Sequence, residues 1–269
     1  LSARRSYLQF LFQALKLPFL PTYNDFQYKH FFEFGDKDQL TILGLGAIDN
    51  FELNEEVNDG ETDQETIDRN NYILGNLPVN DQWNYTIGAN WKHFSKNSYQ
   101  NVIISRNHLN NSALKYKDNI EDPNELLYDY NSEEIENKLR IESTKRMNGW
   151  NWNIGAGFEH VEYTNSTFNK RVVNDEVTII DFDSEFSMQK YSLFTQVSKS
   201  VLNERLSLSL GIRTDANSYA DEMSNLIDQL SPRFSASYQF TEKFSASFNL
   251  GRYYQLPAYT VMGYRDNDG

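Results

Sequence analysis

The chain has 269 residues, of which 39% are hydrophobic, 14% aromatic and 23% charged, and its formal net charge is −13. A sequence with this many aromatic residues and this regular a pattern is not disordered. Its negative net charge excludes nucleic acid as the main partner, because binding to phosphates requires a basic surface. The absence of Cys excludes a disulfide scaffold, a thiolate nucleophile and a cysteine metal site.

The first apolar segment has helical spacing. Leu8, Leu11, Phe12, Leu15 and Phe19 recur at intervals of three or four, and two prolines, at positions 18 and 21, end the pattern. The spacing predicts a short helix that either lies in a membrane interface or, in the interpretation we favour, covers the mouth of its own barrel. The segment is too interrupted to span a membrane, and no other segment approaches the roughly 18 apolar residues needed.

From about Phe26 onward, apolar and polar residues alternate, which is the pattern of strands with one apolar face. The alternation is clearest in five segments, which are residues 83–91, 150–158, 206–212, 234–240 and 244–250. Weaker copies at 26–34 and 191–197, with an apolar run at 39–49, bring the prediction to about ten strands. Many of them exceed the roughly 5 to 6 residues typical of soluble sheets, and long strands suit a membrane.

Short and long connections alternate between these strands. Short turns are predicted near Asp36, Asn97, Asn148, Asn203 and Glu242. Long polar loops are predicted at about 50–81, 109–134, 164–186 and 218–229. Because each strand reverses direction, the short turns should lie on one rim, taken as periplasmic, and the long loops on the other, which is typical of bacterial outer-membrane barrels.

The polar faces of the strands favour a membrane barrel over a soluble sandwich or a lipocalin-type barrel. They carry mainly Ser, Asn, Gly, Thr and Gln, whereas a sheet exposed to solvent carries more Lys and Glu. We therefore predict that the apolar faces point outward to lipid and the small polar residues inward to a wet lumen. The residues predicted to face lipid include Trp83, Trp91, Leu208, Ile212, Phe244 and Phe248.

No motif for catalysis is present, so the sequence predicts neither an enzyme nor a cofactor. Its four His residues lack zinc spacing, and nucleophile-elbow, P-loop and dinucleotide-binding motifs are absent. Two acidic groups are weak candidates for Ca²⁺, which prefers oxygen ligands, although solvated or lipopolysaccharide-facing acid is the simpler explanation. They are Asp59, Glu61, Asp63 and Glu65 in the first long loop, and Asp181, Asp183 and Glu185 on one face of an extended segment.

An aromatic group near the end of the chain is the candidate for substrate contact. Aromatic rings beside an arginine can stack on a sugar, a chelate or a peptide. The alternative is an aromatic belt at the membrane interface. The residues of this group are Tyr253, Tyr254, Tyr259, Tyr264 and Arg265.

Several phrases of the sequence resemble the barrels of TonB-dependent outer-membrane receptors of the Bacteroidetes type. The longest is LSPRFSASYQFTEKFSASFNLGRYYQLPAYT at residues 230–260. Earlier ones are RRSY at 4–7, PTYNDFQYK at 21–29, and GDKDQL followed by LGLGAIDNF, which ends at Phe51. Their order and spacing extend the resemblance over nearly the whole chain.

This resemblance implies an energised importer of the bacterial outer membrane, with a barrel of about 22 strands and an N-terminal plug. The implied cargo is a scarce nutrient such as a metal chelate, a vitamin, a glycan or a peptide. The implied partners are outer-membrane lipid and lipopolysaccharide, the TonB energy-transducing complex acting through the plug, and a surface lipoprotein.

The fold predicted for residues 1–269 is an all-β, antiparallel, open part of such a barrel. No plug-like domain, TonB box or terminal aromatic strand is recognisable, so we expect an internal fragment in which the strand near Phe248 is not paired with the first strand. Two other functions stay open. One is a passive pore or structural barrel in an outer-membrane assembly, and the other is a soluble all-β binding domain.

Overall fold

The computed structural model describes residues 1–173 and 176–265, most of which belong to long strands. The strands are β1 Ser2–Arg5, β2 Phe19–Phe34, β3 Asp38–Leu53, β4 Val79–Ser95, β5 Ser98–Tyr116, β6 Leu126–Met147, β7 Trp150–Val173, β8 Glu176–Val201, β9 Leu206–Asn217, β10 Ser231–Thr241 and β11 Phe244–Gly251. The helices are α1 Leu8–Ala14, α2 Gln64–Asn76 and α3 Tyr259–Met262, with short 3₁₀ turns η1 Glu55–Asn58, η2 Lys117–Asn119, η3 Pro123–Glu125 and η4 Asp221–Met223.

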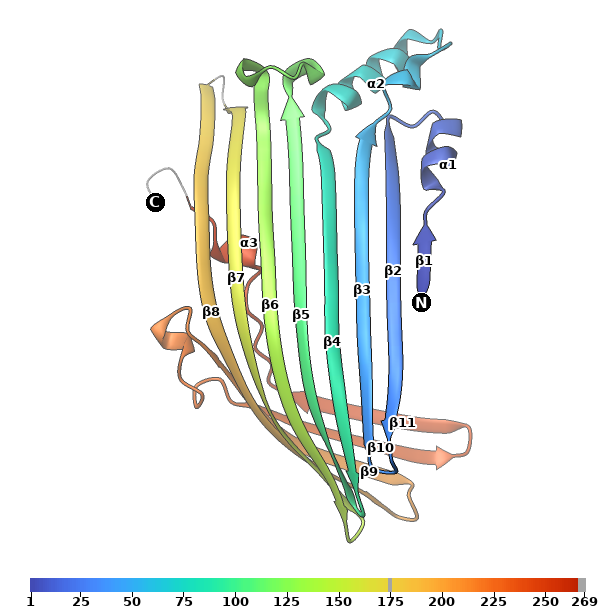
Figure 1. The fold of residues 1–269 in the computed structure, drawn as a ribbon, viewed down its shortest axis with the longest axis vertical. Coiled ribbons are helices and arrows are strands. Elements are labelled where there is room, and N and C mark those ends of the chain that lie inside the picture. Colours follow the sequence, from blue (N-terminus) through green and yellow to red (C-terminus); the bar gives the residue numbers. More distant parts are fainter. Residues whose placement is uncertain (174–175, 266–269) are drawn as a thin grey trace.

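The strands form one antiparallel sheet in which spatial order equals chain order. Figure 1 shows the long strands β2 to β8 running side by side, while β9 to β11 cross the lower half of the view, so the sheet bends around one side. Within the described residues, β1 pairs with β2 and β11 pairs with β10, and no ladder joins the two edges. The predicted open partial barrel is confirmed, with eleven strands instead of about ten because the four-residue β1 was not foreseen.

The predicted turns lie together at one end of the sheet, because consecutive strands run in opposite directions. In Figure 1 the turns that connect β2 to β3, β4 to β5, β6 to β7 and β8 to β9 are at the bottom, and the turn between β10 and β11 is at the lower right. Three of these turns have two residues, and one of the three joins β6 to β7 through Asn148 and Gly149, whose φ angles are 53° and 77°. Asparagine and glycine tolerate these left-handed conformations, which match the twist of a hairpin. The arrangement of the rims is confirmed, and its assignment to the periplasm stays a prediction.

Two of the predicted long loops are wrong, because most of their residues are paired strand. β5 continues to Tyr116 and β6 begins at Leu126, so residues 117–125 alone connect them. Pairing of β7 with β8 continues as far as Val173 and Glu176, and residues 174–175 lie outside the described residues. In these extensions the apolar residues no longer lie on the outward face: on β8, Asp181 and Asp183 face outward while Phe182 and Phe186 face inward, so the pattern of the lipid-facing segments is lost while the backbone ladder continues. The loops between β3 and β4 and between β9 and β10 are confirmed, and they contain α2 and η4.

The six residues predicted to face lipid lie on the exposed side of the sheet, with 37% to 61% of each side chain accessible. The opposite side carries the small apolar cluster of Val161, Met188 and Met262, where α3 packs against β7 and β8. Side chains alternate between these two faces, which confirms the predicted orientation. None of the helices in the described part of the chain combines the length and hydrophobicity needed to cross a membrane.

The predicted short helix is present as α1, between β1 and β2. The Phe12 ring packs edge-on against Phe19, and Phe19 stacks on Phe51 at 5.1 Å between ring centroids. The rest of its apolar side is open, since Phe10 is 64% and Leu11 51% exposed. Exposure of this kind favours the interfacial position over the interpretation that the helix covers the mouth of the barrel, and both stay predictions.

The order of the rims predicts the pattern of surface labelling. The chain contains no Cys, so single-cysteine variants provide unique probes. Asp59→Cys, in the connection between η1 and α2, is expected to react with a membrane-impermeant maleimide in intact cells, whereas Asn148→Cys should react only after the cells are lysed. Labelling of Asn148→Cys but not of Asp59→Cys in intact cells would invert the topology.

Candidate functional site

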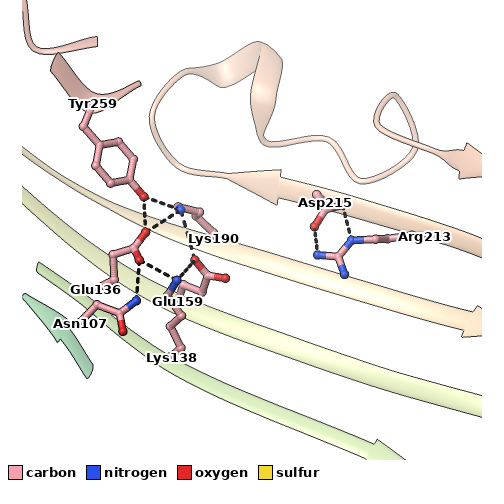
Figure 2. Close-up of polar contacts among 8 residues, drawn as sticks. All are labelled: Asn107, Glu136, Lys138, Glu159, Lys190, Arg213, Asp215 and Tyr259. Carbon is pink, nitrogen blue, oxygen red and sulfur yellow. Dashed lines mark hydrogen bonds and ion pairs between the residues drawn. The ribbon is translucent and has the colours of Figure 1, made fainter. Parts of the chain in front are cut away.

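Charged side chains gather on the inward side of β5 to β8, below the segment 252–265 that follows β11. They occupy positions that alternate with residues facing lipid: Glu159 follows Phe158, and Lys190 precedes Tyr191. We call the group the luminal network (Figure 2). Its members are Asn107, Glu136, Lys138, Glu159, Lys190 and Tyr259.

Glu136 on β6 is the centre of this network. Lys138 Nζ lies 2.6 Å from its Oε2 atom, to which Asn107 Nδ2 also donates at 3.1 Å. The Tyr259 hydroxyl donates to Oε1 at 2.6 Å. Lys190 Nζ lies 3.5 Å from the same Oε1 atom. The carboxylate is therefore held by donors from β5, β6, β8 and α3 together (Figure 2).

Lys190 links Glu136 to the second acid of the network. Its Nζ atom lies 3.2 Å from Glu159 Oε2 and donates to the Tyr259 hydroxyl at 2.6 Å. Two carboxylates face two ammonium groups, so the network has no net charge when all four are ionised. Such pairing is needed because these side chains are largely withdrawn from water, with 18% exposed for Glu136 and 21% for Lys190.

The segment 252–265 is also held to the wall of the sheet by apolar contacts. Met262 packs on Val161 and Met188, both of which are fully buried. Next to it the backbone of Gly263 approaches the Tyr163 ring so closely that a Cβ atom there would lie 2.4 Å from the ring. Glycine at this position therefore permits the contact.

Tyr259 contributes its hydroxyl as a neutral group. Burial and the adjacent Glu136 carboxylate raise the pKa of Tyr259 above its ordinary value. The phenol stays protonated at neutral pH, so it can donate to Glu136 while it accepts from Lys190.

Removing this hydroxyl is expected to loosen the segment. Tyr259→Phe loses two hydrogen bonds to charged partners, each of which contributes about 1.5 to 3 kcal/mol in proteins. Hydrogen exchange of residues 252–265 should become about tenfold faster or more, while exchange in β3 stays unchanged. The matched control Tyr264→Phe has no described hydrogen bond to lose at its hydroxyl. Equal exchange in the two variants would show that Tyr259 is not an anchor.

A cavity of about 440 Å³ lies between β7 to β10 and residues 254–257. Its charged lining comprises Glu159, Lys190, Arg213, Asp215 and Arg233. Arg213 and Asp215 form a two-point ion pair, with Nε to Oδ2 at 2.7 Å (Figure 2). Arg233 has no ion pair with any described residue, and its guanidinium lies 4.7 Å from the Tyr253 ring centroid. The cavity thus offers one arginine free for an anionic or hydrogen-bonding solute.

The five residues predicted to contact substrate do not form one cluster. Tyr254 lines the cavity, and its hydroxyl donates to the Asp228 carbonyl oxygen at 3.0 Å. Tyr259 belongs to the luminal network. Tyr253 lies against Arg233.

The other two of these five residues point elsewhere. The Tyr264 ring packs edge-on against Phe182, and Arg265 donates to the carbonyl oxygens of Met262 and Tyr264. Substrate contact by any of the five stays a prediction.

The acidic candidates lie apart from this site. Asp183 and Glu185 line a shallow cavity of about 490 Å³ at the upper part of β8, and Asp181 precedes them on the same face. Among the described residues, no three His, Asp or Glu side chains converge as ligands of one metal ion. Calcium binding by this group stays a prediction.

In the first long loop, two of the four acidic residues have local roles. Asp63 caps α2 by accepting from the Thr66 backbone N–H at 3.2 Å. The hydrogen bond from the Thr66 hydroxyl, and then this backbone contact, lower the pKa of Asp63. Glu61 accepts from the backbone N–H groups of Thr62 and Asp63. Through these hydrogen bonds, Asp63 and Glu61 stabilise the start of α2, which explains why two of the four acidic residues are present.

The luminal network itself was not predicted. The inward face of β6 is charged from Glu134 to Glu142, so Glu136 and Lys138 do not stand out there, but Glu159 on β7 and Lys190 on β8 interrupt inward faces that otherwise carry mainly uncharged residues. A charge at such a position is unusual enough to indicate a partner on a neighbouring strand.

Comparison with known proteins identifies the architecture. A family model described as "TonB dependent receptor-like, beta-barrel" matches residues 14–268. No curated protein sequence matches the chain significantly.

Solved structures with the same fold include three receptors and transporters. The copper transporter OprC superposes with a TM-score of 0.63 at 12% identity, over 90% of this chain and 38% of that one. A mutant of the ferric enterobactin receptor PfeA from Pseudomonas aeruginosa superposes with a TM-score of 0.59 at 15% identity, over 89% of this chain and 34% of that one. The RagAB peptide importer superposes with a TM-score of 0.55 at 10% identity, over 85% of this chain and 31% of that one. This chain therefore spans about a third of the length of each.

Proposed function

The chain belongs to the TonB-dependent receptor β-barrel family of the bacterial outer membrane, and from this we propose that it forms part of the wall of a receptor that imports a scarce nutrient into the periplasm. The three similar structures are named for copper, for ferric enterobactin and for peptides. The cargo proposed for this receptor is a metal chelate, a vitamin, a glycan or a peptide. Binding and uptake, not catalysis, are what a receptor of this family performs.

The domain proposed for residues 1–269 is an open section of a larger barrel. The outer edges of β1 and β11 have no strand partner among the described residues. Unpaired backbone groups in a bilayer cost several kcal/mol each, so further strands of the receptor must cover these edges. We propose that the same receptor contains the plug, through which the TonB complex supplies energy. A surface lipoprotein is a further proposed partner.

The observation that carries the proposal is the polar cavity on the inward side. The segment 252–265 folds against the inner wall and closes one side of the cavity, and Tyr259 ties it to Glu136 and Lys190. A solute entering from the long-loop rim would meet charged and aromatic groups there. An inward segment held by both polar and apolar contacts favours a selective receptor over an unobstructed pore.

The proposal is tested by uptake in a strain that lacks the receptor gene and depends on a limiting nutrient. The full-length receptor should restore growth only when TonB is present. Growth restored equally without TonB would instead indicate the passive pore. The soluble binding domain is excluded by the family to which the chain belongs.

The unpaired arginine of the cavity predicts a measurable loss of uptake. Arg233→Gln is expected to raise the nutrient concentration that gives half-maximal uptake by about tenfold, because one charge-assisted contact is lost. Arg205→Gln, in the short turn between β8 and β9, is the matched control and should behave as the wild type. Identical uptake by all three proteins would remove Arg233 from the binding surface.

A further inference from the structure

The lipid-facing side of the sheet contains an apolar groove of about 590 Å³ across β3 to β7. All five strands have both neighbours present, so the groove does not depend on the missing part of the barrel. The short Ala89 side chain lies between bulkier neighbours and leaves space there. The apolar walls are formed by Ile42, Ile87, Ala89, Ile104, Leu139 and Phe158.

Arg106 lies at the polar end of this groove. Its Nε atom donates to the Tyr85 hydroxyl at 3.1 Å, and its Nη1 atom donates to Asn137 Oδ1 at 2.8 Å. The second terminal nitrogen, Nη2, has no hydrogen bond to any described residue, and no described carboxylate pairs with Arg106. The side chain is thus oriented by neutral partners while its charge is not neutralised.

The position of Arg106 explains how a charge is tolerated on this face. An arginine at the middle of a bilayer costs about 2 to 4 kcal/mol, and this cost falls towards the interface. Tyr85 and Trp83, which stack 6.4 Å apart on the adjacent strand, are residues typical of the aromatic belt at that level. The backbone of Arg106 pairs with Ile87, and its side chain extends from there to the Tyr85 hydroxyl, so the guanidinium points towards the head groups on the side of the long loops.

We propose that Arg106 and the groove bind one phosphorylated lipid of the outer leaflet. The guanidinium holds the phosphate, for which its fork of N–H donors is suited, and an acyl chain lies along the groove. This site faces away from the lumen, so it is separate from the site proposed for the nutrient. It accounts for an arginine without an acidic partner in a chain whose formal charge is −13.

The test is titration of the delipidated full-length receptor with bisphosphorylated lipid A in detergent, with bound lipid counted by native mass spectrometry. Arg106→Gln is expected to weaken binding about tenfold. The matched control is Arg140→Gln, which makes the same change on the inward side, where Arg140 contacts Glu142. Ala89→Phe, which fills the groove, should also weaken binding.

Two outcomes would overturn the proposal. One is equal affinity of the wild-type receptor and Arg106→Gln for lipid A. The other is binding of fully dephosphorylated lipid A as tightly as the phosphorylated form. The second comparison uses the wild-type receptor alone, so it decides the question even if a variant fails to fold.

Discussion

Ile154→Arg is expected to destabilise the folded receptor in a bilayer by about 2 to 4 kcal/mol. Ile154 lies at the centre of the lipid-facing run of β7, between Trp150 and Phe158, and 61% of its side chain is exposed. A guanidinium at this depth replaces an apolar contact with lipid and cannot easily reach either interface. Leu208→Arg should cost less, since Leu208 pairs with Lys199 close to the short-turn rim.

The measurement is reversible unfolding by guanidinium chloride in lipid vesicles, with heat-modifiable gel migration to report the folded fraction. Asn153→Arg is the matched control, because the adjacent residue faces the lumen and lines a cavity of about 310 Å³. It should change stability by much less. A larger loss for Asn153→Arg than for Ile154→Arg would mean that the two faces of the sheet have been assigned the wrong way round.

Glu136→Ala is expected to have the second largest effect, a loss of about 2 to 3 kcal/mol. The substitution leaves two ammonium groups, Lys138 and Lys190, close together without the acid that both contact. It also removes the acceptors of Tyr259 and Asn107. The estimate is kept below the roughly 3 to 5 kcal/mol of a fully buried pair, because water of the lumen reaches part of the network.

The same unfolding assay measures this loss. Glu142→Ala is the matched control on β6, because Glu142 faces the same side and contacts Arg140. The double variant Glu136→Ala with Lys138→Met should lose less unfolding free energy than the sum of the losses of its two single variants. The reason is that the second substitution removes a charge that the first leaves unpaired. Strict additivity, or equal losses for Glu136→Ala and Glu142→Ala, would contradict a central role for Glu136.

The sequence by itself determined the lipid-facing surface and the hairpin turns. Period two is a local property: Trp150, Trp152 and Ile154 lie on one face whatever the sheet around them does. Turns are local as well, as the left-handed angles at Asn148 and Gly149 show. A strand in lipid must have one continuous apolar face, so its hydrophobic pattern is strong and readable.

The tertiary structure alone decided how far the strands extend and which side chains meet in the lumen. Above the lipid the outward face of β8 carries acids such as Asp183 while Phe182 and Phe186 face inward, so the pattern of the lipid-facing segments is reversed there and does not show where the strands end. Tyr259 reaches Glu136 across a sequence separation of 123 residues. That contact depends on the register of intervening strands and on the bending of the sheet, both of which arise from pairing between distant segments and are not encoded in any local pattern.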